Sequence, residues 1–146
     1  PSAAKQQAKT ERKAAIANSF ENLAREWHTN QLPRWTPTHA ARVLHSLEVD
    51  AFPVIGALPI IEIKAPLLLE MVRGIEARGV PETAIRVLQR VKSVFNYAIR
   101  TGRAVENPAF ALAGVVVKES VQHQPALPQT ELTEFYRRLT IQAKRA

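Results

Sequence analysis

Arginines recur at helical spacing in the segment ETAIRVLQRVKSVFNYAIRTG, residues 82–102. Arg86 and Arg90 are four residues apart, so a helix would place them one turn apart on the same face. Tyr97 continues this polar face, and Thr83 lies near the helix start, where a hydroxyl and backbone N–H groups can hold a phosphate. This arrangement could bind adjacent phosphates of a nucleic acid, or a guanine edge in the major groove.

A second polar face is predicted nearer the beginning of the chain. Thr38, Arg42 and His45 are four and three residues apart, which brings them to one side of a helix. Thr36 can cap this helix, with Pro37 at its first position. The two faces together supply the candidate binding residues, which are Thr36, Thr38, His39, Arg42, His45, Thr83, Arg86, Arg90, Tyr97 and Arg100.

The composition favours a polyanionic partner. The 146 residues include 20 Lys and Arg against 13 Asp and Glu, which gives a formal net charge of +7 and a pI of about 10.3. A charged helix face is often no more than a solvated surface, so the charge alone does not identify the partner. A nucleic acid is one polyanion that such basic helix faces would suit.

Other kinds of site are not expected from this sequence. Without cysteine, the chain has no thiol nucleophile, thiolate metal site or disulfide. The histidines lack the spacing of metal ligands, and they are His28, His39, His45 and His123. The sequence contains neither a Gly-rich phosphate loop nor a paired-carboxylate motif. We therefore expect no catalytic residue, metal, cofactor or small-molecule ligand.

The apolar runs are too short for a membrane protein. None approaches the roughly 18 residues that a transmembrane helix needs, and the first residues lack the apolar centre of a signal peptide. We expect a cytoplasmic protein with no membrane partner. The chain begins with Pro1 and its one methionine is Met71, which indicates a piece of a longer protein.

Apolar residues at steps of three and four predict four helices and an all-α fold, a compact four-helix bundle. The first helix is expected at about residues 10–30. The inward stripes are expected to be Ile16, Phe20, Leu23, Ala24 and Trp27 in the first helix, Ala40, Val43, Leu44 and Leu47 in the second, Leu68, Met71, Val72 and Ile75 in the third, and Ala84, Leu88, Val91, Phe95 and Ala98 in the fourth. The connector ALPIIEIKAP is interpreted as a buried extended loop, because one short strand would have no partner.

Changes in composition along the chain predict four segments. Residues 1–15 are rich in Ala and Lys and are interpreted as a basic helical or linker extension. Residues 16–114 would form the helical domain. Residues 115–129 lose periodicity and gain prolines, as is typical of an interdomain linker. Residues 130–146 would begin a further helix.

Three motifs together resemble one known family. They are FPVIGALPIIEI, the ETA that opens residues 82–102, and the ending YAIRTGRAVENPA. They are similar to the core-binding domain of phage-type integrases in the tyrosine recombinase family, a SAM-like bundle, over about residues 20–115. The resemblance implies that the second and fourth helices face duplex DNA at a recombination site and form one jaw of a clamp, with other recombinase protomers as further partners.

The resemblance also implies where the chemistry is not. In this family the catalytic tyrosine and arginines belong to a separate domain, and residues 130–146 would be its beginning. Residues 1–15 would be the linker that follows an amino-terminal arm-binding domain. His39 and Arg42 match a short H-x-x-R pattern of that catalytic domain, but they fall in the wrong domain. This chain would therefore bind DNA without cleaving it.

Two other readings of the same residues stay open. A helical protein-interaction module would use its charges only for solubility and would not bind DNA. A helix-turn-helix transcription regulator would protect symmetric half-sites, although its third helix offers almost no polar face to a DNA backbone.

Overall fold

Helix starts are set by the capping residues and prolines that the sequence supplies. Thr36 Oγ1 accepts a hydrogen bond from the His39 N–H at 3.2 Å, and Pro37 takes the first helical position, as predicted. Ser19 caps the preceding helix in the same way, by accepting a hydrogen bond from the Asn22 N–H.

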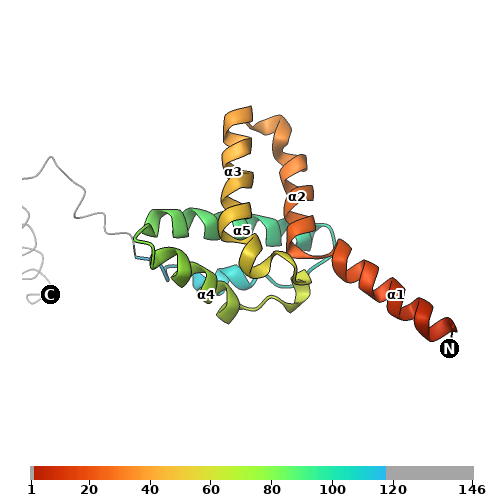
Figure 1. The fold of residues 1–146 in the computed structure, drawn as a ribbon. Helices are drawn as coiled ribbons and strands as arrows, with labels where there is room; N and C mark the ends of the chain where they lie inside the picture. Colours follow the sequence, from red (N-terminus) through yellow and green to blue (C-terminus); the bar gives the residue numbers. More distant parts are fainter. Residues whose placement is uncertain (1, 118–146) are drawn as a thin grey trace, which may run out of the picture.

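This computed structural model describes residues 2–117, and it is all-α in that range, as expected. Its α-helices are α1 (Ser2–Ala17), α2 (Phe20–Gln31), α3 (Pro37–Asp50), α4 (Ala65–Glu76) and α5 (Pro81–Arg100), with short helical turns at Leu32–Arg34, Phe52–Gly56, Ile60–Glu62 and Pro108–Leu112. The helices α2 and α3 form a hairpin that crosses α5, while α4 runs beside α5 (Figure 1).

The long helix α5 is central, since it packs against α2, α3, α4 and the turn Pro108–Leu112. Its buried residues are Ala84, Val87, Val91, Val94, Phe95 and Ala98. Leu88, expected in this stripe, is only partly buried. The buried stripe is rotated toward Val87 and Val94 because α2 and α3 cover that side, whereas Leu88 faces the shallower cover of Pro108–Leu112.

The single helix expected over residues 10–30 is wrong, because the chain breaks after α1. The Phe20 N–H donates to Leu58 O and the Ile60 N–H donates to Asn18 O, both at 2.9 Å. These long-range bonds hold Ser19 in an extended conformation, which a helix cannot continue. As a result α1 has no buried residue and leaves the bundle (Figure 1), and Ile16, which was expected inside, is 65% exposed.

The connector between α3 and α4 is not a strand, as expected, but it is not simply extended either. Residues Ile60–Glu62 form a 3₁₀ turn. Ile60 and Ile63 are buried in the core, while Ile61 points outward and is 64% exposed. The turn thus directs two of the three isoleucines into the core.

Asn107, in the motif ENPAFAL, holds the turn after α5 against that helix. Its Nδ2 donates to the Lys92 carbonyl at 3.0 Å and to Asn96 Oδ1 at 2.8 Å, and its Oδ1 accepts from the Ala109 N–H at 3.0 Å. One buried side chain therefore fixes the turn Pro108–Leu112 to the flank of α5. This asparagine serves the fold rather than a binding surface.

Packing on the core continues to the end of the described range. Val116 is buried and the Val115 N–H donates to Leu112 O at 3.0 Å. The predicted further helix at residues 130–146 and most of the predicted linker lie outside the described residues.

Candidate nucleic-acid interface

A groove of about 370 Å³ runs between α3 and α5. Its lining comes from three elements and consists of Trp27, Trp35, His39, Val43, Arg86, Gln89, Arg90 and Ser93. Across it, Arg90 Nη1 donates a hydrogen bond to Ser46 Oγ at 2.6 Å. Side chains of α3 and α5 therefore meet along one groove, and His39 is the polar residue that α3 contributes to its lining.

Aromatic rings form one end of the groove and fix the start of α3. The Trp35 ring makes edge contacts with Trp27 and with His39, at centroid distances of 5.4 and 5.2 Å. Buried His28 lies beside Trp35 and is hydrogen-bonded through Nε2 to the Ala40 carbonyl at 2.7 Å. Because that carbonyl is on α3, the ring cluster locks α3 onto α2 and gives His39 a defined position.

The groove concentrates positive charge. Burial lowers the pKa of Arg90, and the neighbouring Arg86 charge acts in the same direction. The guanidinium nevertheless remains ionised at neutral pH. Two like charges held this close repel one another, so a bound anion between them would relieve that repulsion.

Four arginines outside the groove are paired with carboxylates. Within residues 2–117, the arginines at ion-pair distance from a carboxylate are Arg25, Arg73, Arg78 and Arg103. None of these four arginines lines the groove. These four differ from Arg86 and Arg90, whose charges repel one another in the groove.

The structure brings together some of the residues predicted from sequence and separates others. His39, Arg86 and Arg90 line the groove. Thr38, Arg42 and His45 are exposed on α3 without lining it, and Arg100 is exposed at the end of α5. Arg42 is one turn before Ser46, so its side chain extends the basic surface beside the groove.

Two threonines have polar groups that are engaged within the chain. The Thr36 hydroxyl is used as the cap of α3. Thr83 is half-buried, and its N–H donates to Val80 O at 3.1 Å. That backbone group is therefore not free for a phosphate, as the position of Thr83 near the start of α5 had suggested.

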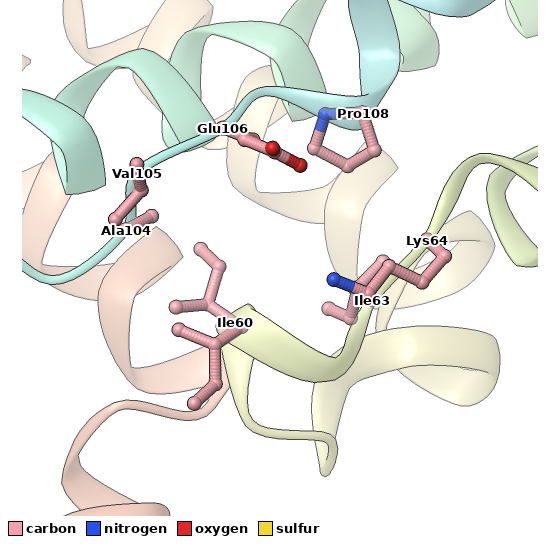
Figure 2. A pocket seen from close by; sticks show the side chains of 8 residues that line it. Ile60, Ile63, Lys64, Ala104, Val105, Glu106 and Pro108 are labelled. Carbon is pink, nitrogen blue, oxygen red and sulfur yellow. The ribbon is translucent and has the colours of Figure 1, made fainter.

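A second cavity of about 280 Å³ lies between the turn Ile60–Glu62 and the segment after α5 (Figure 2). It is lined by Ile60, Ile61, Ile63, Lys64, Ala104, Val105, Glu106 and Pro108. Its walls are largely aliphatic and carry one cation and one anion. This chemistry does not suit a polyanion, so the groove is the better candidate for nucleic acid.

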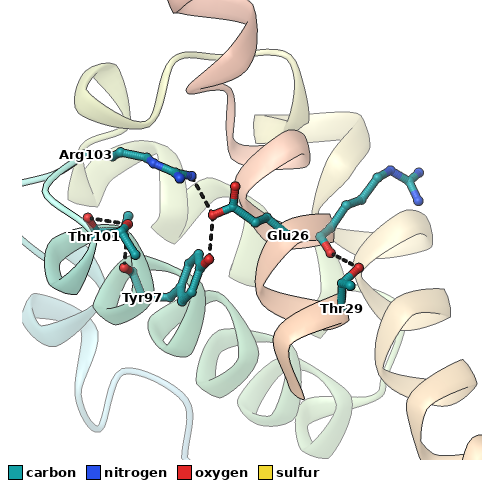
Figure 3. A network of polar contacts seen from close by, with 7 residues as sticks. Glu26, Thr29, Tyr97, Thr101 and Arg103 are labelled. Atoms are coloured by element: carbon teal, nitrogen blue, oxygen red, sulfur yellow. Dashed lines mark hydrogen bonds and ion pairs between the residues drawn. The ribbon is translucent and has the colours of Figure 1, made fainter. Parts of the chain in front are cut away.

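Tyr97 belongs to a polar network that sequence spacing does not reveal (Figure 3). Its hydroxyl donates to Glu26 Oε2 on α2, and Arg103 Nη1 donates to the same oxygen at 2.6 Å. Hydrogen bonds from Arg103 and then Tyr97 hold the pKa of Glu26 below its usual value, and the bond to Glu26 raises the pKa of Tyr97. Glu26 is thus the main polar residue at this surface that was missed.

Ser46, Gln89 and Ser93 were also left out of the predicted set. Gln89 and Ser93 do lie on the predicted polar face of α5, and helical spacing could have included them. No local signal marks Glu26, because its partners are 71 and 77 residues away in sequence.

The described residues contain neither a cluster of metal ligands nor a membrane-spanning helix. No three metal-binding side chains cluster within residues 2–117. No helix in that range is long and apolar enough to cross a membrane.

Comparison with known proteins gives consistent matches. Residues 20–115 match the family model described as the phage integrase central domain. The chain is 36% identical to the integrase of Enterobacteria phage P4 over 95% of its length, and 34% identical to the integrase of Shigella phage Sf6 over 90%. It spans about a third of the length of these relatives, 31% and 34% respectively.

Solved structures agree. A solution structure of a fragment of the Escherichia coli phage integrase IntS is 34% identical, with a TM-score of 0.62 over 77% of this chain and 96% of that one. The Nitrosospira multiformis protein Nmul_A0922 is 28% identical, with a TM-score of 0.58 over 62% of this chain and 87% of that one.

Proposed function

Because this chain belongs to the phage integrase central domain family, we propose that it is the duplex-DNA-binding, core-binding part of a site-specific tyrosine recombinase. The observation that carries the proposal is the groove in which Arg86 and Arg90 of α5 meet His39 of α3. Membership of this family supports a role in DNA integration and recombination. The geometry supplies a surface for the DNA.

The physical argument rests on charge and shape. Duplex DNA carries about one charge per 1.7 Å of axis, and each phosphate that a cation neutralises releases counterions. The bond to Ser46 holds Arg90 in place before DNA arrives, so less side-chain entropy is lost on binding. Arg42, exposed one turn before Ser46 on α3, would contact a neighbouring phosphate.

The division of roles follows from side-chain chemistry. The arginines would position the backbone without reading sequence. Gln89 is neutral, exposed and between Arg86 and Arg90 on the groove wall, so it is suited to contact a base edge rather than a phosphate.

The chain itself would not cut DNA. Strand cleavage needs a nucleophile beside clustered arginines that stabilise the phosphate transition state. Tyr97 instead bonds to a carboxylate, which repels the charge that would develop there. In the intact protein, cleavage and rejoining would be carried out by parts outside this chain, with other protomers assembled at the recombination site.

Both tryptophans of the chain line the groove, and this gives the test an internal probe. A labelled 20-base-pair duplex is titrated with the chain while its anisotropy and the tryptophan emission are followed, from low to high salt. We expect binding at low salt that weakens steeply as salt rises, together with a change in tryptophan emission. No binding at low salt would favour the protein-interaction reading.

Paired variants show whether the groove is the surface used. Arg86→Ala with Arg90→Ala should abolish most binding. Arg73→Ala with Lys64→Ala removes the same charge from α4 and its N-cap and should leave binding nearly intact. Footprints of two symmetric half-sites would instead support a helix-turn-helix regulator.

A further inference from the structure

Two hydrogen-bond donors converge on one point beside α5. The Tyr97 hydroxyl and Arg103 Nη1 both donate to a single oxygen, Glu26 Oε2 (Figure 3). Tyr97 comes from the last turns of α5, Arg103 from the segment that follows, and Glu26 from α2. The carboxylate oxygen marks a position where an anionic oxygen is well bound.

The same pair of donors would suit a phosphodiester oxygen. A guanidinium and a hydroxyl both bind phosphate through short, charge-assisted hydrogen bonds. The side chains of Arg103 and Glu26 are 31% and 43% exposed, so solvent and ligands reach them. An ion pair this exposed contributes little to stability, and a competing anion can therefore replace the carboxylate at small cost.

The position of the pair continues the groove. Arg86, Arg90 and Ser93 line it, and Tyr97 is four residues beyond Ser93 on the same face of α5. A DNA backbone that follows α5 from Arg86 would therefore pass the hydroxyl of Tyr97.

We propose that Tyr97 and Arg103 form a second phosphate-binding site for the DNA backbone, which the Glu26 carboxylate occupies until DNA displaces it. The inference rests on the proposed function, since it needs a duplex in the groove. Glu26 then lowers the affinity for DNA. Its negative charge cancels that of Arg103, and when DNA binds the carboxylate is left unpaired near phosphates. Glu26 therefore weakens non-specific DNA binding at this end of the surface.

The test removes the charge of Glu26 without changing the shape of the side chain. Glu26→Gln keeps the size of the side chain and an acceptor oxygen but loses the charge. Anisotropy titrations over a salt series should show tighter binding to a mixed-sequence duplex, with a salt slope steeper by up to about 0.9, the value for one additional phosphate. The matched control Glu76→Gln removes an acid paired with Arg73 on α4 and should change neither quantity as much.

A change that leaves the charge alone separates a site from a general electrostatic effect. Tyr97→Phe removes only the hydroxyl and, combined with Glu26→Gln, should cancel part of the gain in DNA affinity. Adding Arg103→Ala to that background should cancel the rest. The proposal is overturned if Glu26→Gln and Glu76→Gln tighten binding equally, or if Tyr97→Phe has no effect in either background. Circular dichroism confirms that each variant is folded, and loss of binding by the unaltered chain would refute the proposed function instead.

Discussion

Arg90 and Ser46 are 44 residues apart in the chain, yet a hydrogen bond of 2.6 Å joins the guanidinium of one to the hydroxyl of the other. The bond spans from α5 to α3 and is partly buried. It sets the distance between the two polar flanks, so the groove has a defined width before any ligand arrives.

Ser46→Ala should loosen this arrangement while leaving every charge in place. We expect the free energy of unfolding to fall by about 1–2 kcal/mol, because the Ser46 hydroxyl accepts a hydrogen bond from Arg90 and also donates one to Val43 O. DNA affinity should fall while the salt slope stays unchanged, because Arg90 remains charged but less ordered. Urea denaturation and anisotropy titrations measure the two effects. Thr29→Ala is the control, since the Thr29 hydroxyl bonds within α2, to Arg25 O, and Thr29 does not line the groove.

Arg86→Ala should lower the salt slope of DNA binding by about 0.9, as expected for the loss of one phosphate contact. Arg73→Ala changes the net charge equally, but Arg73 is paired with Glu76 on α4. Its slope should match that of the unaltered chain. Equal slopes for the two variants would contradict the placement of DNA in the groove.

Asn107→Ala should destabilise the bundle by roughly 2 kcal/mol, because it leaves the buried Ala109 N–H without its partner and removes the bonds to Lys92 O and Asn96 Oδ1. Asn96→Ala removes only one of the three bonds and should cost less. Urea denaturation ranks the two variants. DNA binding by the folded fraction should be unchanged, and a specific loss of DNA affinity would show that the ENPA motif has a binding role.

Glu26 should make stability depend on pH in the acid range. Its pKa in the folded chain is lowered below 4.5, so its contribution is fully present above 4.5 and is lost as the pH falls through the folded value. Unfolding free energies of the unaltered chain and Glu26→Gln should therefore differ by a constant amount from pH 7 to about 5.5 and converge below pH 4.5. A difference that grows on acidification would contradict the network.

Local patterns were sufficient for the parts of the fold that depend on neighbours in sequence. Thr36 and Pro37 mark the start of α3 through the hydrogen bond and φ restriction of adjacent residues. The apolar spacing of α5 likewise identified Ala84, Val91 and Phe95 as buried. For the same reason the polar face opposite this stripe was located correctly.

The features that were missed depend on distant segments. Asn18 and Ser19 are neither Gly nor Pro, and pairing with residues 58–60 ends α1 there together with the N-cap that Ser19 provides for α2. Glu26 has an ordinary helical context, and only the folded chain brings Tyr97 and Arg103 to it. Spacing can tell which side chains share a face, but not which of them an acid on another helix will neutralise.

Because the chain breaks at Ser19, the length of α1 sets how far its residues extend from the bundle. α1 contains 16 residues, which at about 1.5 Å per residue span roughly 24 Å, and the bond between Asn18 and Ile60 anchors its base. Base pairs in B-form DNA are stacked about 3.4 Å apart, so this rod is as long as roughly seven of them. Lys5, Lys9 and Lys13 lie about 18, 12 and 6 Å from Ala17 along this rod, so α1 places its charges at increasing distances from the bundle.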